Sequence, residues 1–296
     1  MKEYLIYGDS TCDLDKTVRD AYGIEYFQMN YVLDGKEYPA SLDWEELSAR
    51  EFYDAMRAGK RITTTQVPTE SYERVFTECA ENGKDVLYVG CSSALSGSIN
   101  LAKVVAKDVM EKYPKSRIVC IDALNSSFGQ GIMLMWASDM RKAGKSIDEA
   151  ASYIEENRLK VSQCATVGKL DYLRRAGRIT ASSAFFGNII GIKPIIISDV
   201  IGQNYAIKKV KGAQNAKEEI AAYQAEQIEN AADQTIWISH ADDEESAAAL
   251  GELLKAKTGC KDIRLGCIGP IVGASVGPGT IISFCVGKEV TIKGEA

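Results

Sequence analysis

The sequence predicts a two-domain α/β protein, with an N-terminal parallel sheet crossed by helices and a C-terminal mixed α/β domain. Short apolar runs alternate with helical segments through residue 160, which is typical of parallel strands joined by crossover helices. Beyond that point an apolar stretch turns back at Gly202-Gln203-Asn204, so the second half has hairpin character. The 296 residues lie at the upper limit for one hydrophobic core. We therefore expect domains at residues 1–160 and 161–296.

Apolar runs and helix signals define the elements of the first half. Strands are expected at residues 4–7, 26–32, 86–89 and 117–122, with a hairpin turn at 34–36. Helices are expected to open at residues 43–47 and at 69, and to span 99–112, 132–140 and 147–159, with Ser146 as the last N-cap. The hydroxyl-rich segment 62–69, taken alone, favours an exposed edge.

The second half is less regular. Strands are expected at residues 165–167, 205–210, 235–239 and 281–286, and helices at 217–230 and 243–257. A glycine- and proline-rich stretch at 268–279 is expected to be a loop before the closing strand. The apolar stretch 184–197 precedes the hairpin turn.

Composition excludes several classes of function. A net charge of −6 and a pI of about 5.2 provide no basic field for nucleic acid or for a membrane surface. No apolar run approaches the ~20 residues of a membrane span, so we expect no stable membrane insertion. The chain enters a strand without a signal-peptide pattern, which makes a cytoplasmic location the default expectation.

Histidine and cysteine usage argues against metal and nucleophile chemistry. The single histidine, His240, leaves little room for a catalytic pair with serine or cysteine. None of the eight cysteines lies within zinc-clip spacing of another, and most sit in apolar runs as small hydrophobic residues. Cys12 and Cys91 lie in loops beside candidate site residues, where packing is still favoured over reactivity. We expect no metal and no cofactor.

One stretch, Val86 to Ser98, has the pattern of an anion site. A buried strand runs into a loop of small and hydroxyl residues and then into a helix, which directs N–H groups and the helix dipole to one point. Helix capping by Ser92, Ser93 and Ser96 explains this stretch equally simply and is favoured when the stretch is considered alone. Asp9 stands at the end of the first strand, where open α/β sheets place ligands.

Five separated stretches, in the same order along the chain, resemble one known family. They are Asp9-Ser10-Thr11-Cys12-Asp13-Leu14, Thr64-Thr65-Gln66, Ser92-Ser93-Ala94-Leu95-Ser96-Gly97-Ser98, Leu173-Arg174-Arg175-Ala176-Gly177-Arg178-Ile179 and the segment 268–279. Together they are similar to the motifs of the DegV family of bacterial fatty-acid-binding proteins. The resemblance spans nearly the whole chain, whereas any one of these motifs alone would be weak.

The resemblance implies a non-catalytic protein that buries one long-chain fatty acid between two α/β domains. By motif position, Thr64 and Ser96 would bind the carboxylate with Arg178 nearby, and Ser93 and Asp9 are further candidates. Members with an assigned role present the carboxylate to a separate fatty acid kinase, which makes acyl phosphate. The family pattern has a histidine where this chain has Ser275. Ser275 stays a candidate binding residue, but the departure weakens the expectation of a kinase partner.

Other residues have plain structural interpretations. The stretch 184–197 is a candidate for part of the tunnel wall, although core packing explains any single residue in it. Arg174 is expected on the solvated surface or at an interface. The role of Lys193 is open, and no chemistry is assigned to His240.

Two other classes of function remain open. A hydrolase or transferase could use Ser96 or Ser93 as nucleophile, but no motif supplies a histidine base, and Asp9 alone is a poor substitute. A nucleotide-binding module could be built on the parallel sheet, but the chain lacks the glycine pattern after its first strand and any Walker sequence.

Overall fold

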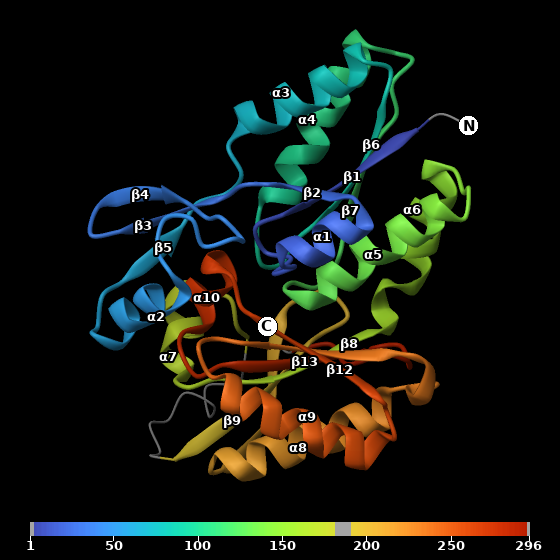
Figure 1. Ribbon diagram of the computed structural model, residues 1–296. Coiled ribbons are helices and arrows are strands. Elements are labelled where there is room, and N and C mark those ends of the chain that lie inside the picture. The colour runs from blue at the N-terminus through green and yellow to red at the C-terminus, as the bar shows by residue number, and fades with distance from the viewer. Residues whose placement is uncertain (1–2, 181–190, 295–296) are drawn as a thin grey trace.

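The computed structural model describes residues 3–180 and 191–294 and contains three sheets in a mixed α/β arrangement. Four strands form a parallel sheet in the order β2-β1-β6-β7, and three form a small antiparallel sheet in the order β4-β3-β5. Six strands form a mixed sheet in the order β10-β9-β8-β13-β11-β12. Figure 1 shows the parallel sheet above and the six-stranded sheet below, which agrees with the two-domain α/β prediction.

The parallel sheet and its crossover helices form the first half of the chain. Its strands are β1 (Tyr4–Asp9), β2 (Ile24–Phe27), β6 (Asp85–Gly90) and β7 (Ile118–Asp122). Its helices are α1 (Lys16–Tyr22), α3 (Thr69–Glu81), α4 (Ser98–Lys112), α5 (Phe128–Lys142) and α6 (Ile147–Asn157). Every residue of β6 is buried, as expected for a central parallel strand. Ser146 caps α6 in a capping box with Glu149, as predicted.

The small sheet corrects one strand prediction. The single strand expected at 26–32 is two strands, β2 and β3 (Asn30–Leu33), which belong to different sheets. The split falls at Met29, whose N–H donates to Ser10 Oγ and whose carbonyl accepts from Ala40. The expected hairpin turn joins β3 to β4 (Lys36–Pro39), and β5 (Ile62–Thr64) is the edge strand expected from the threonine run.

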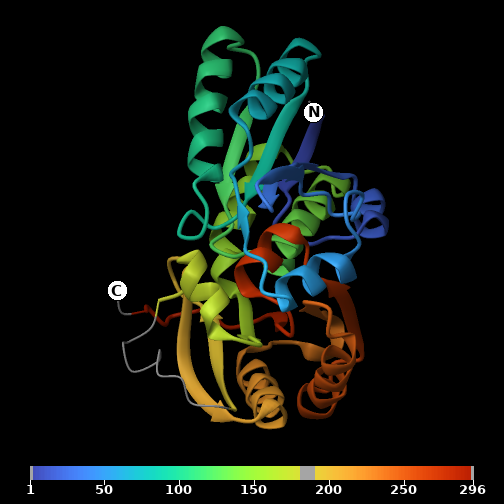
Figure 2. The same cartoon turned by 90° about the vertical axis from the view of Figure 1, so that its left-hand side faces the viewer.

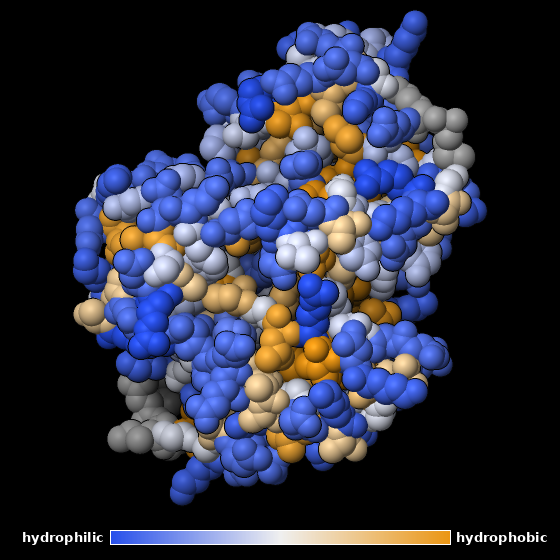
Figure 3. Space-filling view, viewed as in Figure 1, coloured by the Kyte–Doolittle hydropathy of each residue, from blue (hydrophilic) through white to orange (hydrophobic). Residues whose placement is uncertain are grey.

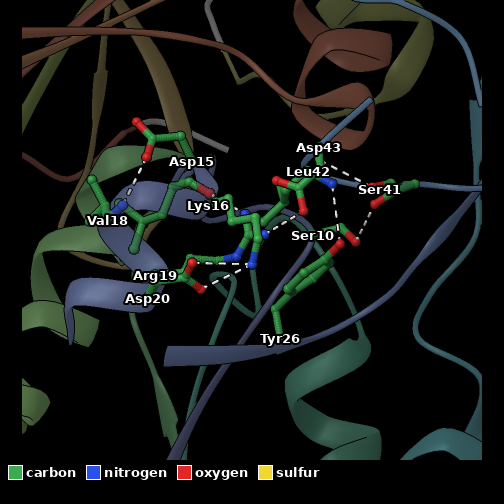
Figure 4. Close-up of polar contacts among 12 residues, drawn as sticks. Ser10, Asp15, Lys16, Val18, Arg19, Asp20, Tyr26, Ser41, Leu42 and Asp43 are labelled. Carbon is green, nitrogen blue, oxygen red and sulfur yellow. Dashed lines mark hydrogen bonds and ion pairs between the residues drawn. The ribbon is translucent and has the colours of Figure 1, made fainter. Parts of the chain in front are cut away.

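A polar network fastens the segment after β4 to the first strand and helix (Figure 4). Ser10 Oγ donates to the carbonyl of Ala40 at 2.8 Å, and Tyr26 accepts from the N–H of Leu42 at 3.3 Å. Arg19, whose side chain is only 7% exposed, forms an ion pair with Asp43 at 2.6 Å. The network fixes the path of the chain from the small sheet towards α2.

Helix α2 (Ala49–Arg57) begins later than the sequence predicted. Trp44 has a φ of 56°, a left-handed conformation that prevents a helix from starting at 43–47. Ser48 is the N-cap instead, and Glu51 completes a capping box with it. The capping pattern was present in the sequence, but the acidic run before it gave a competing helix signal.

The six-stranded sheet is formed by the second half of the chain. Its strands are β8 (Val161–Thr166), β9 (Ile192–Ser198), β10 (Asn204–Lys211), β11 (Thr235–His240), β12 (Asp262–Cys267) and β13 (Ile281–Val286). Helices α8 (Ala213–Gln227) and α9 (Glu244–Thr258) cover one face, and short 3₁₀ turns lie at Arg158–Lys160 and Ala231–Asp233. The predicted hairpin is β9–β10, whereas β12 was missed because its charged residues hide the strand pattern.

Two short helices occupy the space between the sheets. They are α7 (Leu170–Ala176) and α10 (Pro270–Val276), and Figure 2 shows α10, in red, between the upper and lower sheets. The prediction of a loop over residues 268–279 is therefore wrong for Pro270–Val276, which form α10. Proline at the first helical position and Gly277 at the C-cap, with a φ of 75°, delimit a helix within a stretch that reads as turn.

The hydrophobic core crosses between the two halves. Phe128 of α5 packs against Trp237 and Phe284 of the six-stranded sheet, with ring centroids 5.1 and 6.3 Å apart. A second, smaller core lies under α8 and α9. On the face shown in Figure 3, hydrophilic residues predominate and surface apolar residues form separate groups. No helix within residues 3–180 and 191–294 is long and apolar enough to cross a bilayer.

Candidate functional site

A cavity of about 700 Å³, including its open mouth, lies between the parallel sheet and the six-stranded sheet. Its roof comes from loops at the carboxyl ends of β1 and β6, which contribute Thr11 and Cys91. Strands β8 and β13 contribute its floor. Helix α10 forms an apolar side wall with Ile271, Val272 and Val276. An apolar wall combined with polar groups at defined positions is typical of small-molecule sites.

A second hollow of similar size, about 690 Å³ with its open side, adjoins the first. The two share Thr64, Arg178 and Ser275 in their linings. Lys60, Arg61 and Arg175 line only the second hollow, so its outer part is basic. Thr64, Arg178 and Ser275 therefore mark the junction between an inner cavity with both apolar and polar lining and an outer hollow lined by basic residues.

Four of the six site residues predicted from the sequence line the inner cavity. Thr64 comes from β5, Ser96 from the loop before α4, Arg178 from the segment after α7, and Ser275 from α10. These side chains come from four segments that are far apart in sequence. The fold thus brings together hydroxyl groups and one guanidinium, which is a suitable donor set for a carboxylate.

Asp9 does not line the cavity but supports its roof. Oδ1 of Asp9 accepts from the N–H of Thr11 at 2.9 Å and from its hydroxyl, and Oδ2 accepts from Tyr88 at 2.7 Å and from the N–H of Cys91 at 3.1 Å. The carboxylate is fully buried. Both of its oxygens are occupied, so Asp9 positions Thr11 and Cys91 rather than facing the cavity.

The serine loop combines capping with a place on the cavity wall. Ser96 Oγ accepts from the N–H of Ser98 at 3.3 Å, at the start of α4, and is 3.1 Å from Ser98 Oγ. Ser93 is exposed and outside the cavity lining, and its N–H donates to Asp122 at 3.2 Å. The capping interpretation and the ligand interpretation of this loop therefore both apply to Ser96, and neither applies to the side chain of Ser93.

Arg178 is held by backbone carbonyls. Its side chain donates to the carbonyl of Leu95 at 3.1 Å and to that of Ala176. Among residues 3–180 and 191–294, no carboxylate lies within ion-pair distance of Arg178, whereas Arg174 pairs with Asp171 on the surface at 3.1 Å. The charge of Arg178 is thus available to the cavity, and Arg174 is solvated as expected.

The remaining candidates have structural roles. Burial raises the pKa of Cys12 to about 12 and raises the pKa of Cys91 further, so both thiols are protonated and poor nucleophiles at neutral pH. Lys193 donates to the carbonyls of Val167 and Gly168 at 3.3 Å each, and burial lowers its pKa. Burial also lowers the pKa of His240, whose Nδ1 accepts from Asp243.

The suggested tunnel wall at 184–197 is only partly described. Residues 184–190 lie outside the described residues. Residues 192–197 belong to β9, where Ile195 and Ile197 pack into the core under α8 and α9. None of the described residues of this stretch lines the inner cavity. Core packing therefore accounts for that part.

Six uncharged polar residues of the cavity were not named as site residues. Thr11, Thr65 and Gln66 lie within the family motifs, whereas Ser126, Gln163 and Asn204 lie outside them. A weak signal existed for Gln163, because an amide within the apolar run before residue 167 is unusual for a buried strand. Ser126 and Asn204 sit next to turns and gave no signal. Within the described part of the chain, no cluster of histidine, cysteine and carboxylate side chains has the arrangement of a metal site.

Comparison with known proteins agrees with this fold. A model of the DegV family, described as uncharacterised proteins, matches residues 4–287. A DegV domain-containing protein of Clostridium perfringens is 35% identical over 287 residues, covering 97% of this chain and 98% of its own. One of Streptococcus pyogenes is 32% identical over 286 residues, covering 97% and 99%.

Solved structures agree with the fold as well. A DegV family protein of Thermus thermophilus, described for its fatty acid binding, superposes with a TM-score of 0.86 at 26% identity, covering 97% of this chain and all of its own. A stearic-acid-binding protein of Eubacterium ventriosum has the same fold, with a TM-score of 0.86 at 23% identity and coverage of 96% and 98%. The chain described here belongs to the DegV family.

Proposed function

We propose that this protein binds one long-chain fatty acid in the inner cavity, with the carboxylate at Thr64, Ser96, Arg178 and Ser275. The observation that carries the proposal is that these four donors, from four separate segments, line one cavity that also has an apolar wall. The fatty acid binding described for the related Thermus thermophilus protein supports the same conclusion. In this proposal the acid lies between domains that meet near residue 160.

Burial of the acyl chain and hydrogen bonding of the carboxylate both contribute to the free energy of binding. Burying an acyl chain contributes about 0.8 kcal/mol per methylene group, or on the order of 10 kcal/mol for sixteen carbons. Each hydrogen bond to the charged carboxylate contributes roughly 1.5–3 kcal/mol. The apolar wall therefore dominates affinity, and the hydroxyls with Arg178 fix the orientation of the acid.

The proposed role is binding rather than catalysis. A serine nucleophile needs a base within hydrogen-bond reach, and none of the described residues that line the inner cavity has an imidazole or a carboxylate. Asp9, a buried carboxylate that supports the cavity roof, is fully engaged with other donors. The eight cysteines are free thiols within the described structure, which suits the reducing cytoplasm we propose as the location.

We further propose that a fatty acid kinase is the partner, with the second hollow as the approach to the carboxylate. Lys60, Arg61 and Arg175 line that hollow, and although Lys60 pairs with Asp34 and Arg175 with Asp171, the basic lining favours a phosphoryl group beside the carboxylate. Ser275 stands at the junction where the family pattern has histidine. Its neutral hydroxyl provides a weaker contact for a phosphoryl oxygen, so we expect only low kinase support from this chain.

Titration of delipidated protein with hexadecanoic acid and with hexadecanol tests the binding proposal. We expect saturable one-to-one binding of the acid and weaker binding of the alcohol, because only the acid has a charge for Arg178. Absence of binding for both ligands would contradict the proposal. Hydrolysis of activated acyl esters, abolished in Ser96→Ala, would favour the serine-enzyme alternative instead.

A further inference from the structure

The inner cavity has a polar group that it does not share with the second hollow. It consists of Ser126, Gln163 and Asn204, none of which lines the basic hollow. The three residues are 8%, 3% and 9% exposed. They come from the loop after β7, from β8 and from the start of β10. No charged side chain belongs to this uncharged polar group, which therefore differs in kind from the carboxylate end.

The fold directs Gln163 to the cavity. Side chains alternate along β8, and its neighbour Cys164 packs into the core under α8 and α9. Gln163 therefore points to the opposite face, towards the parallel sheet. Asn125 Nδ2 donates to the carbonyl of Val161 at 3.3 Å, which holds the loop carrying Ser126 against the strand carrying Gln163. The two side chains thus face the same part of the cavity.

The hydrogen bonds in this polar group leave Gln163 Oε1 and the Ser126 hydroxyl without partners among the described residues, besides the second N–H of each amide. Gln163 Nε2 donates to Asn204 Oδ1 at 3.1 Å, and Asn204 Nδ2 donates to the carbonyl of Arg178 at 3.0 Å. Within residues 3–180 and 191–294, Gln163 Oε1 and Ser126 Oγ have no hydrogen-bond partner. Thr11, by contrast, is satisfied by Asp9 and Gln130.

A plain alkyl chain fits this region poorly. If methylene groups displaced water from Gln163 Oε1, a nearly buried acceptor would be left without a donor, which is unfavourable. A site that has hydrogen-bonding groups for a substrate hydroxyl discriminates strongly against the analogue that lacks it. A hydroxyl group on the ligand supplies one donor for Gln163 Oε1 and one acceptor for Ser126 Oγ, which matches these two groups.

We propose that Ser126 and Gln163 select a fatty acid that carries a hydroxyl group along its chain, away from the carboxylate. The inference rests on the proposed function, since it takes the carboxylate to lie at the junction of the two cavities. Asn204 is a positioning residue in this scheme, because it fixes the Gln163 amide so that Oε1 faces the ligand.

The experiment compares octadecanoic acid, 10-hydroxyoctadecanoic acid, 12-hydroxyoctadecanoic acid and 2-hydroxyoctadecanoic acid on the delipidated full chain. At least one mid-chain hydroxy acid is expected to bind about tenfold more tightly than octadecanoic acid, which corresponds to about 1.4 kcal/mol at 25 °C. The 2-hydroxy acid, whose hydroxyl lies at the carboxylate end, is expected to show no such gain.

Two variants connect the preference to these residues. Ser126→Ala removes a hydroxyl that has no partner among the described residues, so the fold is retained and the preference is expected to fall several-fold. Gln163→Met keeps the side-chain length. It is expected to remove the preference by increasing the affinity for octadecanoic acid, because no buried acceptor is then left without a donor. Gln214→Leu, on the exposed face of α8, is the control and is expected to change neither affinity.

The outcomes separate this inference from the proposed function. Binding of no acid at all contradicts the proposed function. Equal affinity for octadecanoic acid and for every hydroxy acid overturns the selection while leaving fatty acid binding intact. A preference that survives unchanged in Ser126→Ala overturns the assignment of Ser126, and Gln163→Met tests its partner in the same way.

Discussion

The backbone N–H of Gly269 donates a 2.9 Å hydrogen bond to Oδ1 of Asp13, although the two residues are 256 positions apart. Asp13 follows β1, and Gly269 is the N-cap of α10, the helix that carries Ser275. The bond therefore links the first strand of the parallel sheet to the wall of the cavity. Asp13 Oδ2 is buried and has no partner among the described residues, and burial raises the pKa of this carboxyl to about 7.

Asp13 is expected to make stability depend on pH between about 4 and 7. Its carboxyl has an ordinary pKa of 3.8 when exposed and about 7 in the fold, so the folded state binds the proton more tightly. Its contribution to the free energy of unfolding is thus full below pH 3.8 and is lost as the pH rises to 7. The loss has an upper limit of about 4 kcal/mol, from 1.36 kcal/mol per pKa unit.

Asp13→Asn isolates this effect, because asparagine still accepts from Gly269 and does not titrate. Urea denaturation at pH 5 and pH 8 is expected to show that the variant gains stability relative to the parent as the pH rises. Parallel pH profiles for the two proteins would mean that Asp13 is ionised in the fold at both values.

Thr64→Val and Ser96→Ala are each expected to weaken fatty acid binding by roughly 1.5–3 kcal/mol, because each removes a hydrogen bond to a charged carboxylate. The matching fatty alcohol should be much less affected. Ser93→Ala is the matched control on the same loop, since Ser93 lies outside the cavity lining. Calorimetric titration gives the affinities, and equal losses for acid and alcohol would indicate that Thr64 and Ser96 only support the loop.

Ser275→His is expected to introduce a pH dependence that the parent lacks. No imidazole lines the inner cavity within the described part of the chain, so the difference between parent and variant isolates a histidine-type step in fatty acid affinity between pH 6 and 8. The protonated imidazole adds charge beside the carboxylate and should tighten binding towards pH 6. If the difference in affinity between parent and variant does not change between pH 6 and 8, position 275 does not face the carboxylate.

Ser275→His is also expected to recover part of the support for a family-type fatty acid kinase. The assay compares acyl phosphate formation by parent and variant at equal fatty acid occupancy. Full activity of the parent, with no gain in the variant, would make Ser275 an adequate substitute for the family histidine.

Gly273 and Tyr53 are in close contact, and this contact positions α10 against α2. Substitutions at the two positions test its importance. A Cβ at Gly273 would lie 2.4 Å from the Tyr53 hydroxyl, which itself donates to the carbonyl of Ile268 at 2.7 Å. Gly273→Ala is therefore expected to destabilise the fold by about 1–3 kcal/mol. The same change should cost less in a Tyr53→Phe background, where the hydroxyl is absent. Denaturation of all four proteins gives the coupling, and additive effects would contradict the contact.

The sequence was most informative where local signals agreed with the fold. The buried strand β6, the hairpin β9–β10 and the capping box of α6 all carry their own patterns, and the structure contains each of them. Helix α10 was missed because a Gly- and Pro-rich segment has low intrinsic helix propensity, and tertiary packing against α2, α7 and β5 overrides it. The sequence predicted one strand where the structure has β2 and β3, because the pattern of apolar residues does not reveal that the chain passes from one sheet to another.

The same distinction holds for the site. Thr64, Ser96, Arg178 and Ser275 lie in recognisable motifs, and all four line the cavity. Asp9 lies in a motif too, but both oxygens of its carboxylate accept hydrogen bonds from Thr11, Tyr88 and Cys91. Only the three-dimensional arrangement distinguishes a residue that faces the ligand from one that supports such residues.

Gln163 illustrates the opposite limit. It belongs to none of the five motifs, and its importance follows from its hydrogen bonds and from the face of β8 on which it lies. The sequence gives only a weak signal for such a residue, because a single amide in a strand has no characteristic neighbours. Its unused acceptor becomes apparent only when the partners of every polar group in the cavity are counted.

The central claim is that the inner cavity holds a fatty acid, and native mass spectrometry of protein purified from bacteria without detergent tests it most directly. We expect a complex with one fatty acid per chain, and organic extraction of the same sample should release a stoichiometric amount of that acid. A protein that carries no fatty acid as purified, and that binds none when fatty acids are added, would contradict the account.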